Sequence, residues 1–409
     1  TGYHKPGYIE VEALKAGIDI LLIPEDIPKA IQSIKIAVAE GELSEEIINT
    51  KCKKILAAKY WMGLAKQKPV DLNHITEDLN SGQAELIVRQ SVQKALTLVH
   101  NQDEIIPLKR LDTLKILSLS IGTKPENVFH QRLRDYYDVD CLNISKFSPQ
   151  QEFHEKLSDS ASYNLMIVSV HSNNSSPAYN FGINPEIIDF LNYVSKKNKV
   201  ILTVFANPYS LRILEDPASF QAIIMGYEDN HITQDYAAQL IFGGIPASGK
   251  MPVSAGQLFP EGTGITLASH TRLKYSVPED AGVNAAILYK VDSIANSAIE
   301  NEATPGCQIL CVKDNTVFYR KSFGHHTYLE SVEVKNEDLY DIASLTKITA
   351  TLPALMKLYE EDQIDIDQPL SNYLPYLDST DKKEIKIKDV LAHQGRLIPW
   401  IPFYLETID

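Results

Sequence analysis

Hydrophobic and polar positions follow two different periods along the chain. Short apolar runs of the kind that form buried strands occur at 17–24, 114–122, 163–171, 200–207 and 222–228. Between them, apolar residues recur every three or four positions, as in residues 184–197, which is the period of a helix with one buried face. Strands that alternate with helices predict βαβ units and a mostly parallel sheet covered on both faces. The pattern therefore predicts an α/β fold for most of residues 1–270.

The first such run, "GIDILLIP" at 17–24, lies between a glycine and a proline and predicts a strand buried on both faces. Helical spacing follows, and Ser44 is placed to cap the next helix. On that helix Ile48, Cys52 and Ile55 share one face. We therefore expect Cys52 to be a packing residue of the core.

Beyond residue 284 the pattern changes. A helix is predicted near 284–301, followed by a β-hairpin over 307–324 with Asp314 and Asn315 at its turn. Cys307 and Cys311 fall on one face of the first strand, too far apart along it for a disulfide. We expect both to be small packing residues.

Composition narrows the classes of function. The 409 residues are 44% hydrophobic and 22% charged, as in a globular protein with more than one domain. The net charge is −14 and there is no basic run, so nucleic acid is an unlikely partner. No apolar run approaches the roughly 18 residues of a membrane span. The four cysteines lack the spacing of metal ligands, and we expect neither a metal site nor a cofactor.

The pattern Ser-x-x-Lys occurs three times, and two of its occurrences are ordinary. Ser91, with Lys94, lies inside a predicted helix, where its hydroxyl is expected to bond to the carbonyl four residues earlier. Ser379, with Lys382, lies in the charged stretch "DSTDKKE". Neither setting gives a serine the rigid, electropositive surroundings that a nucleophile needs.

The third occurrence, "DIASLTKITAT" at 341–351, has a different setting. Ser344 is predicted in the first turn of a helix, where free N–H groups and the helix dipole favour negative charge on oxygen. Lys347 follows on the same face, and if desolvated it can accept the serine proton. An ordinary helix cap is the alternative. Pro353 is expected to kink this helix beyond the turn that carries Ser344 and Lys347.

Two other motifs do not point to a site. The segment "GGIPASGKM" at 243–251 has the spacing of a phosphate-binding loop, but Met251 replaces the Ser or Thr that would bind magnesium. The neighbours His325 and His326 point to opposite sides of a strand and are poorly placed to share one metal ion. We expect both to be surface residues.

Longer segments carry a family resemblance. "HKPGYIEVEALKAGIDILLIPED", "SVQKALTLVHNQDEIIPLK" and "GYEDNHITQDYAAQLIFGGIPASGKMPVS" resemble the later part of a family 3 glycoside hydrolase of the bacterial β-N-acetylglucosaminidase type. The resemblance implies that 1–66 is the last part of a (β/α)8 barrel and 67–270 the α/β sandwich domain. It also places the family's catalytic Asp and His-Asp acid ahead of Thr1. We therefore expect no glycosidase chemistry in this chain alone.

The last part of the chain resembles another family. "PGCQILCVKDNTVFYRKSFG", "LYDIASLTKITAT" and "IKDVLAHQGRL" are similar to the beginning of a serine β-lactamase or penicillin-binding-protein-like domain. This implies that 284–409 is a truncated α+β domain of that type, with Ser344 as its nucleophile and Lys347 as its activating base. Two features depart from the family: the loop at His393 carries Gln394, and no later tyrosine (359, 373, 376 or 404) begins a Tyr-x-Asn.

Together these resemblances predict a fragment of a bacterial cell-envelope hydrolase. Its parent is expected to cleave β-linked N-acetylglucosamine and to carry an appended serine hydrolase module for acyl transfer, while the fragment itself is inactive. The substrate would be carbohydrate or peptidoglycan-derived, and the parent periplasmic or at the cell surface. Two alternatives stay open: a non-catalytic protein that binds glycan or a partner, and an esterase.

Overall fold

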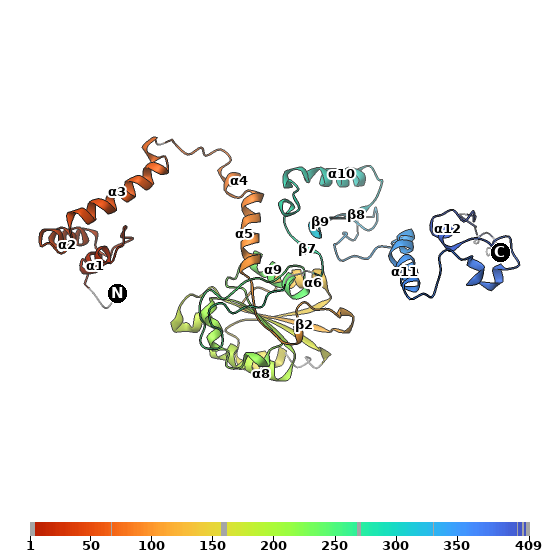
Figure 1. The fold of residues 1–409 in the computed structure, drawn as a ribbon, viewed down its shortest axis with the longest axis horizontal. Coiled ribbons are helices and arrows are strands. Elements are labelled where there is room, and N and C mark those ends of the chain that lie inside the picture. The colour runs from red at the N-terminus through yellow and green to blue at the C-terminus, as the bar shows by residue number, and fades with distance from the viewer. Residues whose placement is uncertain are drawn as a thin grey trace. The chain divides into compact units, whose positions relative to one another are not determined.

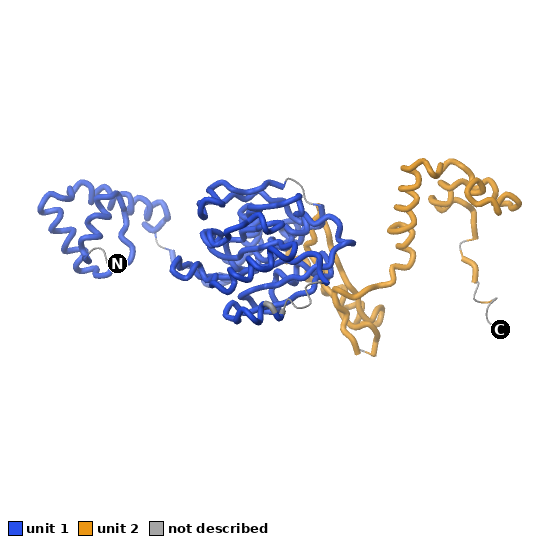
Figure 2. The backbone as a smooth tube through the Cα atoms, turned by 90° about the horizontal axis from the view of Figure 1, so that it is seen from below, with its two compact units in different colours: residues 1–283 blue, residues 284–409 orange. Residues whose placement is uncertain are grey.

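The computed structural model describes residues 5–66, 68–156, 162–267, 271–329, 331–398, 400–402 and 405; within helix α7, the side chains of His154 and Lys156 are not described. The chain forms two compact units, residues 1–283 (unit 1) and 284–409 (unit 2), which Figure 2 draws in different colours.

The first part of unit 1 is helical. It contains α1 (Tyr8–Lys15), α2 (Ile27–Ala39), α3 (Glu45–Trp61) and the short α4 (Ile75–Leu79). As predicted, the Ser44 side chain caps α3, since its Oγ accepts a hydrogen bond from the N–H of Ile47 at 3.2 Å. α1 and α2 share a small core.

Two predictions for this part are wrong. Residues 17–24 form no strand, and Leu22 and Ile23 are 84% and 86% exposed. A strand requires a hydrogen-bonded neighbour, and no described residue pairs with this segment. Cys52 is exposed as well. α3 has no fully buried residue, and its contact with the small core of α1 and α2 is made by Ile48, one turn before Cys52. The barrel assignment for 1–66 stays a prediction.

A six-stranded sheet forms the centre of unit 1. Its order is β1-β6-β5-β4-β2-β3, with β1 antiparallel to β6 and every other pair parallel. The strands are β1 (Thr97–Asn101), β2 (Ile116–Ile121), β3 (Val139–Ile144), β4 (Leu165–His171), β5 (Val200–Phe205) and β6 (Ala222–Met225). The predicted mixed α/β class with a mostly parallel sheet is therefore confirmed.

Helices cover both faces of this sheet, as Figure 1 shows with α6 and α9 on one side and α8 on the other. The helices that pack on it are α6 (Val128–Tyr136), α7 (Gln150–Lys156), α8 (Pro185–Lys197) and α9 (His231–Phe242), and α5 (Gly82–Ala95) packs against α9. Each face has its own apolar core, one built with α6 and α9 and the other with α7 and α8. Burial on both faces explains why β2, β4 and β5 read as continuous apolar runs.

Four of the six strands of this sheet were predicted, and the other two, β1 and β3, were missed. The predicted helix near 84–99 ends at Ala95, and the residues after it form β1. β3 lies at the sheet edge and mixes the buried Val139 with the exposed Asp140, so it lacks the continuous apolar run of its neighbours.

Helix α9 is the most deeply buried helix described. From Ile232 to Phe242 every residue is buried, including Asp235. The Asp235 carboxylate accepts hydrogen bonds from Arg89 at 3.0 Å and from Arg132 at 2.6 Å. Two guanidinium groups thus compensate one buried carboxylate, which makes α9 compatible with an otherwise apolar environment. Unit 1 also contains the two-residue strand β7 (Lys274–Tyr275).

Unit 2 begins with α10 (Tyr289–Glu300) and the predicted hairpin. β8 (Gly306–Lys313) pairs antiparallel with β9 (Thr316–Gly324), and Asp314 and Asn315 form the turn with φ angles of 49° and 59°. Positive φ at both central residues is the requirement of a type I′ turn, which explains the Asp-Asn sequence. Farther on lie α11 (Leu352–Glu360) and α12 (Ile387–Leu391).

Candidate active site

Ser344 and Lys347 lie together at the start of a helical segment in unit 2. Ser344 is the middle residue of a 3-10 turn (Ala343–Leu345), and Lys347 opens a π-helical turn (Lys347–Thr351) that leads into α11. The Lys347 Nζ donates a hydrogen bond to the Ser344 Oγ at 3.0 Å. The structure thus brings the two predicted site residues into direct contact.

The backbone just before the serine is strained. Ala343 has φ 42°, a left-handed conformation that residues with a Cβ rarely adopt. Its N–H donates to the Asp341 Oδ1 at 2.7 Å, and the Leu345 N–H donates to the Ile342 carbonyl at 2.9 Å. Strain of this kind is concentrated at functional positions, where the surrounding hydrogen bonds hold the backbone in place. The sequence pattern gave no sign of it.

The helix after the serine differs from the predicted one. The pattern predicted a single helix kinked at Pro353, but the α-helical part starts at Leu352, so this proline lies in its first turn. In the first turn the backbone N–H has no partner within the helix, so the missing N–H of proline does not break the helix. The departure from regular α-helical geometry lies instead in the wide π turn over Lys347–Thr351. π turns inside helices are frequent at functional sites.

The site is open to solvent. Every residue from 341 to 350 is exposed, so the structure does not show the desolvation of Lys347 that the sequence suggested. Among the described residues no carboxylate forms an ion pair with this amine. The Ser344 Oγ is therefore accessible from solvent, with the Lys347 Nζ beside it.

The other Ser-x-x-Lys motifs behave as ordinary sequence. The Ser91 Oγ donates to the Ile87 carbonyl at 2.8 Å, which confirms the predicted bond to the residue four positions earlier. Lys382 donates to the Asp381 carboxylate at 2.7 Å. Spacing alone therefore does not bring serine and lysine together, and the local backbone decides.

The remaining motifs show no site either. Lys250 donates to the Gly264 carbonyl. His326 contacts the Asp338 carboxylate at 2.7 Å. Across the described part of the chain, no group of three or more His, Cys, Asp and Glu side chains is arranged to hold a metal ion. Tyr404, one of the tyrosines considered above, lies outside the described residues.

Sequence reasoning missed a buried polar cluster at the carboxyl ends of strands β2 and β4. A chain of hydrogen bonds of 2.8–3.0 Å runs through five side chains. They are Asp229, His171, Ser169, Ser120 and His130. The signal in the sequence is the polar residues that interrupt apolar strands, as in "LSLSIG" and "IVSVH". Ser120 and Ser169 are fully buried, so substrate cannot reach them and the cluster braces the sheet.

Burial sets the charge of this cluster. Burial lowers the pKa of His130 to about 4, and the nearby Arg134 acts in the same direction. Burial acts to raise the pKa of Asp229, but hydrogen bonds with His171 and Gln234 outweigh it and hold that pKa below its usual value. His130 is therefore neutral and Asp229 ionised near neutral pH.

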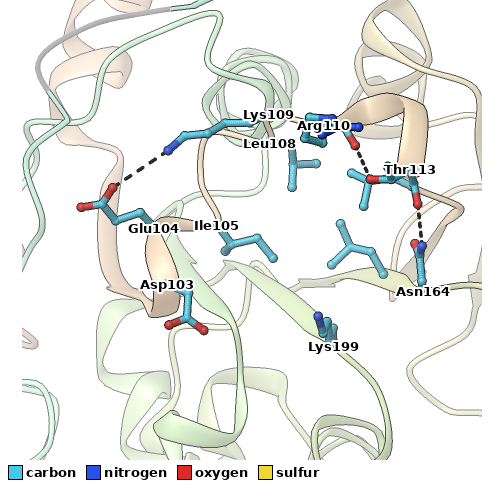
Figure 3. A pocket seen from close by; sticks show the side chains of 11 residues that line it. Asp103, Glu104, Ile105, Leu108, Lys109, Arg110, Thr113, Asn164 and Lys199 are labelled. Atoms are coloured by element: carbon cyan, nitrogen blue, oxygen red, sulfur yellow. Dashed lines mark hydrogen bonds and ion pairs between the residues drawn. The ribbon is translucent and has the colours of Figure 1, made fainter.

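A cavity of about 450 Å³ lies at the amino ends of the parallel strands. Figure 3 shows Lys109 reaching toward Glu104, 4.0 Å away, and Asn164 donating to the Thr113 carbonyl at 2.7 Å. Lys199 also lines it. Open α/β sheets bind ligands at the opposite edge, outside the carboxyl ends. We do not assign a site here.

One family model matches a part of unit 2. Residues 291–406 match the Beta-lactamase family model. A protein of Escherichia coli (strain K12) named "Putative D-alanyl-D-alanine carboxypeptidase" is 31% identical over 144 residues, which cover 32% of this chain and 33% of that protein. Its namesake in Salmonella enteritidis PT4 (strain P125109) is 29% identical over 126 residues, 29% of each chain. The chain thus spans about a third of the length of these curated relatives.

Solved structures of glycosidases are similar over most of the chain at low identity. One is a family 3 β-N-acetylglucosaminidase from Paenibacillus sp. str. FPU-7, with a TM-score of 0.47, 19% identity, and coverage of 64% of this chain and 49% of that one. A β-glucosidase from Listeria innocua has a TM-score of 0.47, 15% identity and coverage of 64% and 44%.

No helix in the described ranges combines the length and apolarity of a membrane span. Unit 1 is a mixed α/β unit with a mostly parallel sheet. Residues 291–406 form a β-lactamase-like domain.

Proposed function

We propose that Ser344 is the nucleophile of a serine hydrolase and Lys347 its general base. The Ser344 Oγ attacks the carbonyl carbon of an ester or amide while the Lys347 amine, once it has lost a proton, takes the hydroxyl proton. That proton then goes to the departing alcohol or amine as the carbon–oxygen or carbon–nitrogen bond breaks. Water hydrolyses the resulting acyl-serine and frees the enzyme.

The hydrogen bond of 3.0 Å between Lys347 and Ser344 carries this proposal. The family match over 291–406 and the strained Ala343 beside the serine support it. The curated relatives are named for carboxypeptidases that act on D-alanyl-D-alanine. We therefore propose peptidoglycan peptides that end in D-alanine as the substrate class.

We further propose that this chain belongs to a longer protein of the bacterial cell envelope, periplasmic or at the cell surface. The resemblance of residues 1–260 to family 3 glycosidases supports a partner activity that removes β-linked N-acetylglucosamine. The acid and nucleophile of that family find no counterpart in this chain's motifs. The proposal is that the chain alone does not cleave glycosides.

A fluorescent penicillin tests the serine module. The protein encoded by the complete gene should be labelled, and Ser344→Ala should abolish the label. Ser91→Ala is the matched control, because this serine has the same motif and bonds only to its own helix. Labelling that survives Ser344→Ala contradicts the proposal. Ester hydrolysis that needs Ser344 in a protein that penicillin does not label would identify an esterase.

Nitrophenyl-N-acetylglucosaminide tests the glycosidase part. The chain of 409 residues should show no turnover above the rate without protein, and the protein encoded by the complete gene should cleave the substrate. Robust turnover by the chain alone would refute the proposal that it lacks this activity.

A further inference from the structure

The strand order of unit 1 contains a point where the chain changes direction across the sheet. From β2 the chain moves to β3 on one side, then returns to β4 on the other side of β2 and continues to β5 and β6. Loops leaving the carboxyl ends of strands at such a point diverge and leave a crevice, which is where open α/β sheets bind ligands. The polar cluster described above fixes these strand ends from within.

A cavity of about 450 Å³ opens at this edge. Lys146 and Phe147, which follow β3, line one part of it, and the loop 174–185, which follows β4, lines the rest. A cavity of this size lies within the range of small-molecule sites. Its walls are therefore formed by the segments that follow β3 and β4, the two strands that flank β2.

Close contacts hold the loop after β4 in one shape. Asn180 and Phe181 have φ angles of 46° and 57°, and Gly182 follows with φ 82°. A Cβ on Gly182 would lie 2.1 Å from the Ser172 Oγ, so only glycine fits there. The same Ser172 hydroxyl donates to the Phe181 carbonyl at 2.7 Å. Consecutive left-handed residues held this way are typical of ligand clamps.

The two walls are also tied together. The Asn184 Nδ2 donates to the Lys146 carbonyl at 2.6 Å, which joins the loop after β4 to the loop after β3. Gly122, at the end of β2, passes so close that a Cβ there would lie 2.8 Å from the His171 carbonyl oxygen. The cavity is thus preorganised, which lowers the entropy lost when a ligand binds.

The side chains at this cavity suit a sugar. Phe147 and Tyr179 are 81% and 71% exposed, and such rings can cover the apolar face of a pyranose. The Asn180 amide makes no hydrogen bond to any residue that the structure describes, and amides both donate to and accept from hydroxyl groups. Lys146, whose Nζ lies 5.2 Å from the Phe147 ring centre, adds a cation. We propose that this cavity binds a short carbohydrate chain.

A phosphate ligand fits less well. α8 begins beside the cavity, but the Asn184 Oδ1 already accepts from the Ile187 N–H at 3.0 Å, and Pro185 has no N–H to offer. The helix start therefore presents fewer donors to an anion than an uncapped one. One lysine is then the main attraction for an anion, whereas the rings and amides recognise neutral sugar surfaces.

This site is separate from the proposed acyl transfer, because it lies in unit 1 and Ser344 lies in unit 2. Ser344→Ala should leave sugar binding unchanged. Loss of sugar binding and loss of acylation are therefore measured independently, and either proposal can fail without the other.

Ligand-observed NMR on the whole chain tests the proposal, with triacetylchitotriose, N-acetylmuramic acid and inorganic phosphate as probes. We expect saturation transfer to at least one sugar, with Tyr179→Ala weakening the affinity at least tenfold. Asn180→Asp tolerates the same left-handed backbone and removes the amide donors, so it should weaken binding too. Lys146→Met should weaken N-acetylmuramic acid more than chitotriose, because only the former carries a carboxylate.

Matched variants away from the cavity control for nonspecific effects. Tyr60→Ala removes an equally exposed tyrosine from α3, and Lys199→Met removes a lysine from the opposite edge of the sheet. Both should bind like the parent chain. Absence of sugar binding, equal losses in Tyr60→Ala and Tyr179→Ala, or binding of phosphate alone would each overturn the proposal.

Discussion

Strand β5 in unit 1 and helix α11 in unit 2 are both rich in apolar residues, yet their environments are opposite. Every residue of β5 is buried, whereas no residue of α11 is. Covering elements make the difference, because α8 and α9 pack on the two faces of the sheet. An apolar pattern thus states which face can be buried, and only a neighbouring element turns that into stability.

The difference matters because the two regions carry different tasks. The buried sheet holds a rigid edge with preorganised loops, and the exposed helix start presents Ser344 and Lys347 to solvent. Substitutions in the sheet should therefore change stability strongly, and substitutions along α11 should change it little. The following experiments measure that contrast.

The largest effect is expected for Phe205→Ala in β5. Phe205 is fully buried, and its ring packs edge-on against Phe129 at 5.5 Å between centroids. Loss of the ring leaves a cavity and should lower the free energy of unfolding of unit 1 by about 3–5 kcal/mol. Phe147→Ala, at an exposed phenylalanine, should change it by less than about 0.5 kcal/mol. Urea unfolding followed by circular dichroism measures both, and equal effects would contradict the burial described.

His130 is expected to make the free energy of unfolding depend on pH, with an effect of similar size. Its pKa is lowered from 6.5 to about 4 in the folded protein, so the unfolded chain binds this proton first as pH falls. Stability that is fully present above pH 6.5 should be lost as the pH falls to about 4, on the order of 3 kcal/mol in total.

His130→Asn removes the titrating group. Unfolding free energies measured at several pH values should then lose this slope between pH 6.5 and 4, whatever the variant's stability at neutral pH. An unchanged slope in the variant would show that another group causes it.

A smaller effect is expected at helix caps. The Asn230 Oδ1 accepts from the Thr233 N–H at 2.9 Å at the start of α9, so Asn230→Ala should cost about 1 kcal/mol. Thr351 precedes α11 and makes no such capping bond, so Thr351→Ala is the matched change without a cap to lose. Urea unfolding should separate the two variants, and a larger loss for Thr351→Ala would reverse the comparison.

The smallest effect is expected for Met356→Ser on α11. This side chain is 62% exposed, so its replacement should alter the unfolding free energy by less than about 0.5 kcal/mol. A loss above 2 kcal/mol, measured by the same urea unfolding, would mean that the helix is covered.

The strands that were predicted correctly in unit 1 are those with a nearly continuous apolar pattern. β2, β4, β5 and β6 were recognisable because strands buried on both faces are predominantly apolar. β3 was missed because an edge strand need not be apolar, and 17–24 was misjudged because a run can resemble a strand and still lack a partner. The prediction for Cys52 failed for a related reason: α3 packs on the small core of α1 and α2 through Ile48, and Cys52 itself stays exposed.

The candidate site was predicted in part. The spacing and helix position of Ser344 and Lys347 indicated contact, and they meet at 3.0 Å. The strained Ala343 and the π turn depend on backbone geometry that propensity and spacing do not encode. The loop 174–185 and Lys146 line one cavity because of the order of the strands in the sheet. The sequence pattern left that order open.

The central claim is that Ser344 is the residue that becomes acylated. Its most direct test is mass spectrometry of peptides from the protein encoded by the complete gene, after incubation with benzylpenicillin or a D-alanyl ester. The account predicts one covalent acyl adduct, on the peptide that contains Ser344, and its absence in Lys347→Met. An adduct on a different residue, or substrate turnover with no adduct on Ser344, would contradict it.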